Sequence, residues 1–176
     1  KKFDKTTRYN INWRNNTFMK KTAKHYLFNH VRTSFLNITA EEMAMIDVLS
    51  RGRLECGFVR SVPYEAAPAN VMPFRGTERL WEAHDLILKA WTTHDGPFNF
   101  EGRWFHSRHV NIWPRPYQQP HPPCWVTVGS AGTAVPVAEH KYIGAVFLAG
   151  YPRVRSVFDG YRAAVSYTHL RAHETL

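Results

Sequence analysis

Cysteine is scarce in this chain of 176 residues, which contains only Cys56 and Cys124. Neither has a second cysteine at the spacing of a zinc site or a redox motif, and both lie in apolar runs where a free thiol behaves as a small hydrophobic group. No apolar run approaches the roughly 20 residues that a membrane-spanning helix needs. We therefore expect no metal site and no membrane span, and the cysteine usage fits a reduced, cytoplasmic location.

Acidic residues are scarce in one part of the chain only. Nine of the 23 Lys and Arg residues fall within residues 1–38, where Asp4 is the single acid, whereas the remaining residues carry 14 basic and 13 acidic side chains. A formal net charge of +9 favours nucleic acid or an anionic membrane as a partner. Because the charge comes almost entirely from one stretch, we expect neither partner. A non-enzymatic basic module that binds polyanions is kept as a rival hypothesis, and it depends on residues 1–32.

Glycine and proline are absent from residues 1–37, which are rich in Lys, Asn and Thr. Three interpretations of this segment stay open: a divergent strand, a basic arm, or a misread or chimeric start. At the other end, residues 165–175 read VSYTHLRAHET, which looks like a translated sequencing adapter and is excluded from fold reasoning. We therefore divide the chain into a basic segment at 1–39, a folded domain at 40–164 and a non-native tail at 165–176.

Residues 40–60 form the most informative pattern in the chain. Apolar side chains near helical spacing follow Glu41 and Glu42, whose charge suits the start of a helix. Gly52 ends this helix, as glycine commonly does, and the apolar run at 53–59 predicts a buried strand. Arg60 stands where that strand ends. These parts make half of a barrel unit, in which ligands bind at the C-terminal ends of the strands.

Downstream, the pattern predicts strands that alternate with helices. Further helices are expected at 77–91, 134–140 and 153–161, and further strands at 98–105, 110–113, 124–128 and 143–148. Thr77 is the expected N-cap of the first of these helices. The strands at 98–105 and 110–113 read as a small hairpin before a proline-rich connector. The alternation predicts an α/β fold with a parallel sheet.

The segment 129–133, GSAGT, is the most suggestive loop chemically. It follows a buried strand and opens a helix, so free backbone N–H groups and the helix dipole provide a seat for a phosphate. The hydroxyls of Ser130 and Thr133 add two donors. An ordinary interpretation stays open as well, because Gly, Ser and Thr are common in turns and helix caps.

Together these segments resemble the luciferase-like flavin-dependent monooxygenases, a family of (β/α)8 barrels. The turn IDVLSRGRL at 46–54 matches a helix-ending motif of that family. The resemblance keeps its order and spacing over residues 40–164, through PYE at 63–65, RGTER at 75–79, FEGRWF at 100–105, WPRP at 113–116, PHPP at 120–123 and the strand and loop at 125–133.

The resemblance implies an α/β fold that is a partial (β/α)8 TIM barrel with a small β-hairpin insertion. A full barrel needs about 200 residues at the least, so this chain holds about half of the strands and reads as a fragment. The strand edges that an incomplete barrel leaves unpaired favour a homodimer, and we expect the fragment itself to be a poor enzyme.

The resemblance also implies an enzyme that uses reduced FMN and oxygen to oxidise a small organic substrate, with a separate flavin reductase as partner. The deazaflavin F420, used for hydride transfer, is the alternative cofactor. The FMN phosphate would be bound by Arg60, Gly129, Ser130 and Thr133, and Tyr64 would lie near the isoalloxazine ring, with plain loop packing as the alternative for that tyrosine.

No catalytic residue can be assigned from the sequence. His84 and Glu65 are expected at the surface, and surface or packing roles are expected for three further histidines, His106, His109 and His121. A sugar-phosphate barrel enzyme is a third hypothesis. It needs a carboxylate or lysine at the strand ends, where this chain offers Arg60, Ser130 and Ala149.

Overall fold

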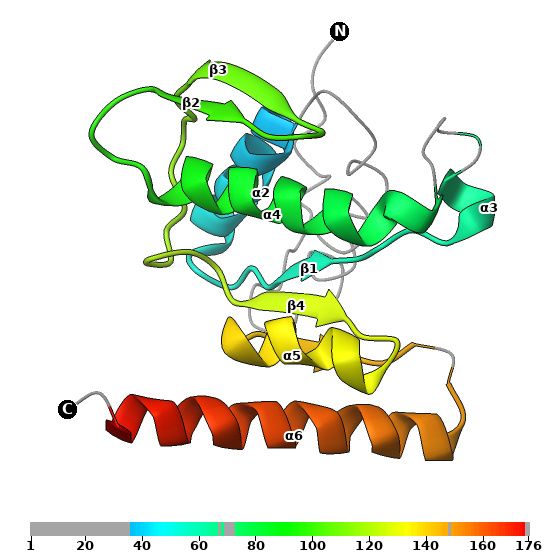
Figure 1. Cartoon of the computed structure of the whole chain (residues 1–176). Coiled ribbons are helices and arrows are strands. Elements are labelled where there is room, and N and C mark those ends of the chain that lie inside the picture. The colour runs from blue at the N-terminus through cyan, green and yellow to red at the C-terminus, as the bar shows by residue number, and fades with distance from the viewer. Residues whose placement is uncertain (1–35, 67, 69–72, 148, 175–176) are drawn as a thin grey trace, which may run out of the picture.

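The fold is known from a computed structural model, which describes residues 36–66, 68, 73–147 and 149–174 (Figure 1). The expected basic segment at 1–39 lies almost wholly outside the described residues, so the three interpretations of it stay predictions.

The described elements follow the expected alternation of strands and helices. The helices are α2 (Leu36–Ser50), α3 (Pro63–Ala66), the 3-10 turn η2 (Pro73–Arg75), α4 (Gly76–Thr92), α5 (Ala131–Glu139) and α6 (Tyr151–Glu174). The strands are β1 (Cys56–Phe58), β2 (Phe98–Glu101), β3 (His106–Val110), β4 (Cys124–Thr127) and β5 (Ile143–Ala145).

Three strands form a parallel sheet in the order β1-β4-β5, and β2 and β3 form a separate antiparallel hairpin. Cys56 pairs with Cys124, and Trp125 pairs with Ile143, so the C-terminal ends of all three strands lie at one edge. The α/β fold with a parallel sheet and a hairpin insertion is therefore confirmed. Figure 1 shows α5 lying between β4 and α6, with α2 and α4 at the other end of the sheet.

Helix α2 begins at Leu36, four residues before its expected start, so Glu41 and Glu42 lie beyond its first turn. The expected stabilisation of the helix start by these two acids is therefore wrong. Its C-terminal end is as predicted: Gly52 has a φ of 75°, and its N–H donates to the Asp47 carbonyl at 2.9 Å. A left-handed residue of this kind is inexpensive only for glycine.

Helix α4 carries its expected apolar face, since Leu80, Ala83, Ile87 and Trp91 are all buried. Trp91 also joins α4 to α2, because its indole N–H donates to the Ala40 carbonyl at 2.9 Å. The expected N-cap, however, is wrong. Arg75 occupies that position without a side-chain hydrogen bond, because the η2 turn runs directly into α4.

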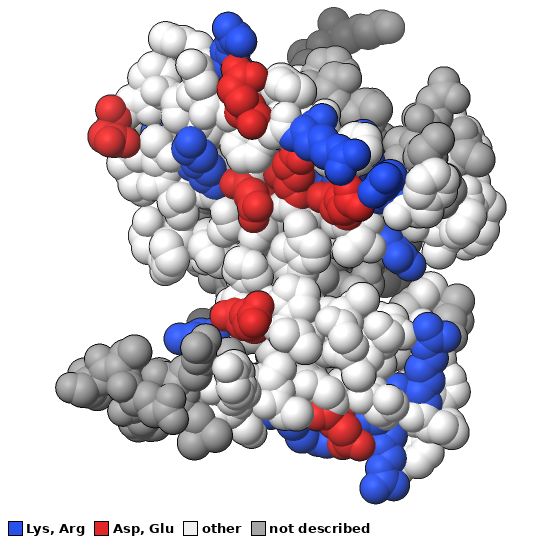
Figure 2. All heavy atoms as spheres, in the orientation of Figure 1, with Lys and Arg blue, Asp and Glu red and all other residues white. Residues whose placement is uncertain are grey.

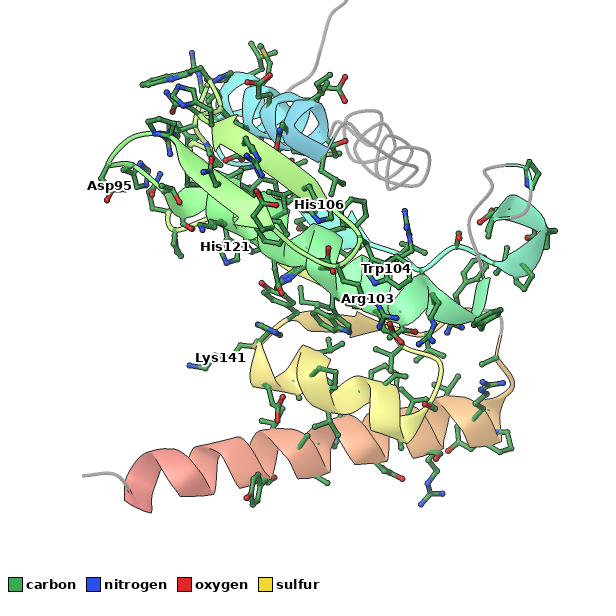
Figure 3. All side chains as sticks on the ribbon, turned by 45° about the horizontal axis from the view of Figure 1, so that its top comes forward. Asp95, Arg103, Trp104, His106, His121 and Lys141 are labelled. Atoms are coloured by element: carbon green, nitrogen blue, oxygen red, sulfur yellow. The ribbon has the colours of Figure 1, made fainter. Side chains whose placement is uncertain are left out.

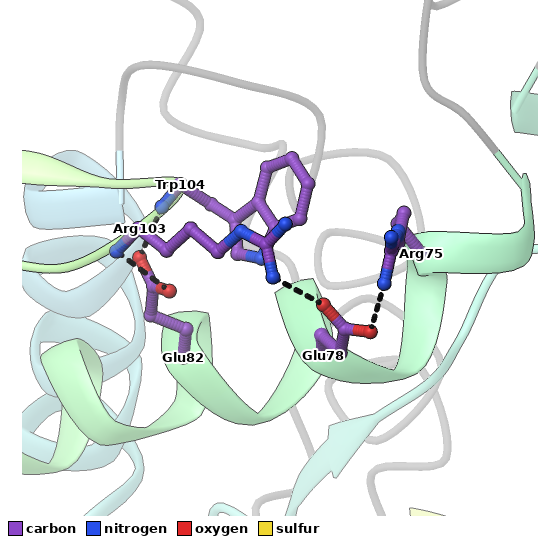
Figure 4. A network of polar contacts seen from close by, with 5 residues as sticks. All are labelled: Arg75, Glu78, Glu82, Arg103 and Trp104. Carbon is purple, nitrogen blue, oxygen red and sulfur yellow. Dashed lines mark hydrogen bonds and ion pairs between the residues drawn. The ribbon is translucent and has the colours of Figure 1, made fainter.

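The Glu82 carboxylate of α4 accepts most of the hydrogen bonds between the helix and the turn of the hairpin, as Figure 4 shows in part. Glu82 accepts hydrogen bonds from the backbone N–H groups of Arg103 at 3.0 Å and of Trp104 and Phe105 at 2.7 Å each. A Cβ atom at Gly102 would collide with the same carboxylate. The second strand ends at Val110, where it was expected to begin. The pairing between β2 and β3 shifts register between Phe98 and Phe100.

Helices α5 and α6 pack closely along each other (Figure 1). The helices approach closely at Gly160, where an added Cβ would lie 2.7 Å from the Ala131 side chain. Helix α6 continues to Glu174, well beyond the expected end at residue 161. The expectation of a non-native tail at 165–176 is not decided by this continuation and stays a prediction.

Candidate functional site

The C-terminal edge of the parallel sheet carries the residues that the sequence singles out for cofactor binding. Phe58 of β1 pairs with Val126 of β4. Continuing this register by two residues places Arg60 beside Val128, immediately before the loop at 129–133. Ligands of parallel α/β folds bind at this edge, because the loops that follow the strands gather there.

Arg60 is exposed and lies across the start of α4. Its Nη1 donates to the Thr77 hydroxyl at 3.2 Å. Its aliphatic stem runs over Gly76, where an added Cβ would lie 3.1 Å from Cγ. The absence of a side chain at Gly76 therefore gives the arginine stem its place, and Thr77 fixes one nitrogen of the guanidinium.

The loop at 129–133 forms a complete capping box at the start of α5. The Ser130 hydroxyl accepts from the Thr133 N–H at 3.4 Å, and Thr133 Oγ1 accepts from the N–H groups of Gly129 at 3.2 Å and Ser130 at 3.0 Å. These N–H groups, which the sequence suggested would be free, are thus used to build the loop. The ordinary interpretation, a helix cap, is realised in the structure.

Two further N–H groups of the same turn differ from these. Among the described residues, no acceptor meets the N–H of Ala131 or of Gly132. A Cβ built on Gly132 would meet nothing within 4 Å, so the space outside this first turn is open. Open donors at a helix N-terminus favour an anion. The residues present therefore fit the phosphate of a flavin nucleotide.

Sequence reasoning missed Arg153, which comes from the first turn of α6. Its Nε donates to the Gly129 carbonyl at 2.9 Å, and its Nη2 lies 3.9 Å from the place where a Gly129 side chain would begin. In the sequence, Arg153 stands at the start of an expected helix, and nothing in that position indicates a contact with the 129–133 loop. Figure 2 shows basic side chains gathering at the end of the molecule where α5 and α6 begin.

Tyr64 lies in the short helix α3, beyond Arg60, and its side chain is 76% exposed. Glu65, in the same helix, accepts from the Val62 N–H at 3.3 Å and has the surface role expected for it. The placement of Tyr64 near a flavin ring stays a prediction.

The expectation that His84 lies at the surface is wrong, because its side chain is only 2% exposed. Its Nδ1 donates to the Asp85 carboxylate at 2.8 Å, and its Nε2 accepts from the Tyr142 hydroxyl at 2.9 Å. Burial lowers the pKa of His84 below its usual 6.5, although Asp85 acts in the opposite direction. The ring is therefore neutral at neutral pH, and both of its nitrogens are satisfied.

This buried group lies away from the C-terminal edge of the sheet. Cys124 and Tyr142, which stand at or just before the starts of β4 and β5, belong to it. Burial raises the pKa of the Cys124 thiol to about 12 and that of the Tyr142 hydroxyl well above its usual value. Burial also raises the pKa of Cys56. None of these groups ionises near neutral pH, so their surroundings favour packing over catalysis.

Two of the other histidines singled out in the sequence, His106 and His109, lie on β3, and the third, His121, lies on the connector. His106 lies exposed on β3, and His121 lies on the connector, where its Nδ1 bonds to the Pro122 carbonyl at 2.8 Å (Figure 3). His109 is exposed as well. In the part of the chain that the structure describes, no three His, Cys, Asp or Glu side chains could hold a metal ion together. No described helix is long and apolar enough to cross a membrane.

The sequence of this chain matches a known protein family over most of its length. Residues 37–168 match the family described as luciferase-like monooxygenase. The chain belongs to the luciferase-like monooxygenase family. The resemblance carried by the motifs at 46–54 and 125–133 is thereby confirmed.

Three members or structural neighbours are informative. The chain is 33% identical over 90 residues to the oxygenase component of the flavin-dependent trigonelline monooxygenase of Acinetobacter baylyi, covering 49% of this chain and 24% of that protein. The oxygenating constituent of 3,6-diketocamphane monooxygenase from Pseudomonas putida, solved in complex with FMN, aligns with a TM-score of 0.66 at 14% identity, over 80% of this chain and 43% of that one. An F420-dependent secondary alcohol dehydrogenase aligns with a TM-score of 0.54 at 16% identity, over 74% of this chain and 41% of that one.

These two structural likenesses show the fold alone. The chain spans about a quarter of the length of the curated relatives that it matches, and under half of these solved structures.

Proposed function

We propose that this chain is part of a (β/α)8 barrel enzyme that binds FMN at the C-terminal edge of its parallel sheet. The enzyme uses reduced FMN and oxygen to oxidise a small organic substrate. The single observation that carries the proposal is the open N-terminus of α5, which follows the end of β4 in a chain of the luciferase-like monooxygenase family. The flavin supplies the redox chemistry, and the protein binds and orients it.

Each residue of the site has a distinct role in this proposal. The N–H groups of Ala131 and Gly132 donate to the dianionic phosphate, and the Ser130 hydroxyl can turn towards it while Thr133 keeps the loop closed. Arg60 supplies positive charge from the neighbouring strand end, held in place by Gly76 and Thr77. Arg60 brings a full positive charge to the dianionic phosphate, whereas Ser130 would donate one hydrogen bond from a neutral hydroxyl. Arg60 should therefore contribute more to FMN binding than Ser130.

The described residues give no general acid or base at this edge, so no proton transfer is assigned to the chain. The relative from Acinetobacter baylyi is named an oxygenase component. By analogy, we include a separate flavin reductase as a partner of the present protein. A homodimer remains part of the same proposal, because β1 and β5 form the two edges of the described sheet.

F420 with hydride transfer is the second candidate, and the dehydrogenase among the structural neighbours is the observation that favours it. The rival polyanion-binding module gains no support from the described residues, because it depends on residues 1–32.

The test uses the full-length gene product and two substitutions at one position. Asparagine and aspartate both cap helices as well as serine does, so Ser130→Asn and Ser130→Asp should keep α5 intact. The aspartate would place a negative charge beside the phosphate. We expect Ser130→Asp to weaken FMN binding on the order of a hundredfold relative to Ser130→Asn, an estimate from the strength of charged hydrogen bonds.

Fluorescence titration measures this difference, and riboflavin provides the control because it has no phosphate. Riboflavin should bind both variants about equally. In the same assay, Arg60→Ala should weaken FMN binding about tenfold to a hundredfold, and Ser130→Ala by less. Equal FMN affinity in the Asp and Asn variants, with both folded, would remove the phosphate site from the 129–133 loop.

A further inference from the structure

We propose that Arg153 is a second arginine for the cofactor phosphate, acting from α6 by fixing the 129–133 loop and adding positive charge beside it. The inference rests on the proposed function, because it concerns the same phosphate.

The contact with the loop uses only one part of the guanidinium. Nε donates to the Gly129 carbonyl at 2.9 Å, and this bond ties the residue before the N-cap of α5 to the first turn of α6. Nη2 lies beside Gly129, since it is 3.9 Å from a Cβ built there. A Cβ at this position would make an ordinary van der Waals contact with the guanidinium.

The terminal nitrogens of Arg153 are the part that remains for a ligand. Among the described residues, no hydrogen bond or ion pair reaches either of them. Two other arginines of α6 differ, because Arg155 and Arg162 both pair with Asp159, at 3.8 Å and 3.3 Å. No acidic side chain among the described residues thus compensates the charge of Arg153, which lies next to the Gly129 backbone.

The packing of the two helices makes this placement specific. Gly160 allows α6 to approach the first residue of α5, Ala131, so closely that an added Cβ would lie 2.7 Å from it. Two turns earlier, the same helix places Arg153 beside the loop that precedes Ala131. Arg60 approaches this edge from β1 and Arg153 approaches it from α6, so a phosphate at the start of α5 would have an arginine from each of two neighbouring elements. Guanidinium groups match phosphate oxygens in both charge and geometry.

The alternative role for Arg153 is purely structural, namely to hold the 129–133 loop without contacting the phosphate. Three variants distinguish these two roles. Arg153→Met keeps most of the aliphatic stem and removes the charge and the bond to Gly129. Arg153→Lys keeps the charge without the planar fork that can serve a carbonyl and a phosphate together. Arg155→Met is the matched control, because it removes an arginine from the same turn of α6 that is already paired with Asp159.

The experiment titrates the full-length gene product with FMN and with riboflavin, at low and at high salt. We expect Arg153→Met to bind FMN about tenfold more weakly than wild type, with riboflavin affinity unchanged and a weaker dependence of FMN affinity on salt. Arg153→Lys should recover part of the FMN affinity, and Arg155→Met should match wild type for both ligands.

Three results would overturn the inference. If Arg153→Met leaves FMN affinity within about twofold of wild type while Arg60→Ala lowers it, the phosphate site stands without Arg153. Equal losses for FMN and riboflavin would make Arg153 a loop clamp only. A wild-type protein that binds FMN no better than riboflavin would contradict the proposed function itself, and the inference with it.

Discussion

Asp47 of α2 and Gln118 of the connector are joined by two hydrogen bonds across 71 positions of the sequence. The Gln118 backbone N–H donates to Oδ2 and the Gln118 side-chain amide donates to Oδ1, each at 2.8 Å. The same amide also donates to the Leu54 carbonyl at 2.9 Å. The Asp47 side chain is fully buried. The family-like turn at 46–54 thus has a structural task, which is to hold the connector that delivers the chain to β4.

Replacing Asp47 should therefore destabilise the fold rather than alter a ligand site. Asp47→Ala leaves the Gln118 N–H without its acceptor in a buried place, and we expect the free energy of unfolding to fall by about 2–4 kcal/mol. Urea unfolding of the full-length gene product measures this. Asp95→Ala, at an exposed turn, is the control and should change little. A loss below about 0.5 kcal/mol for Asp47→Ala would show that the connector does not depend on this contact.

Glu82 and Glu78 lie one turn apart on α4 and provide a matched pair (Figure 4). Glu82 accepts three backbone N–H groups from the hairpin, whereas Glu78 makes only exposed ion pairs, with Arg75 at 2.7 Å and Arg103 at 3.4 Å. We expect Glu82→Gln to cost about 1–3 kcal/mol of stability and Glu78→Gln no more than about 0.5–1 kcal/mol. Thermal or urea unfolding would compare them. Equal costs would mean that the hairpin is not held by Glu82.

The buried His84 predicts that stability depends on pH. The unfolded chain takes up a proton at this residue near pH 6.5, and the folded protein does so only at lower pH, chiefly because burial disfavours the charged ring. The unfolded state therefore binds more protons as the pH falls through this window. The stabilisation is fully present above pH 6.5 and is lost as the pH falls towards the folded pKa.

The measurement is the urea midpoint at several pH values for three proteins. Wild type and His106→Gln, whose histidine is exposed on β3, should lose stability with the same slope below about pH 6.5. His84→Gln should start less stable and show a shallower slope. The neighbouring His140 and His121 also disfavour a charge on His84. Identical slopes in all three proteins would show that His84 does not cause the pH dependence of stability.

The sequence predicted those features that depend on local pattern. The apolar face of α4, the glycine end at Gly52 and the order of strands and helices follow from periodicity and turn chemistry. The face of α2 was only partly predicted, because Met43 is buried whereas Val48 and Leu49 are exposed. The burial of His84 could also have been found, because it lies four residues after Leu80 and three before Ile87, on the same face of α4. The polar residue type and its acidic neighbour concealed it.

Features that depend on distant contacts were not predictable in this way. Nothing near Glu82 indicates that it will hold the turn at 102–105, and nothing near Arg153 indicates a bond to Gly129. The N-cap at Thr77 failed because the η2 turn extends the helix backwards. At the candidate site, the sequence placed the 129–133 loop and Arg60 at the C-terminal edge of the sheet. Only the structure shows which backbone N–H groups of the loop take part in the helix cap and which remain open.

The most direct test of the account is the choice of cofactor by the full-length gene product. Fluorescence titrations with FMN, riboflavin and F420 under identical conditions would measure it. We expect FMN to bind at least about tenfold more tightly than riboflavin, because a phosphate at the start of α5 gains charge-assisted hydrogen bonds. F420 should bind more weakly than FMN. Equal affinities for FMN and riboflavin, or a preference for F420, would contradict it.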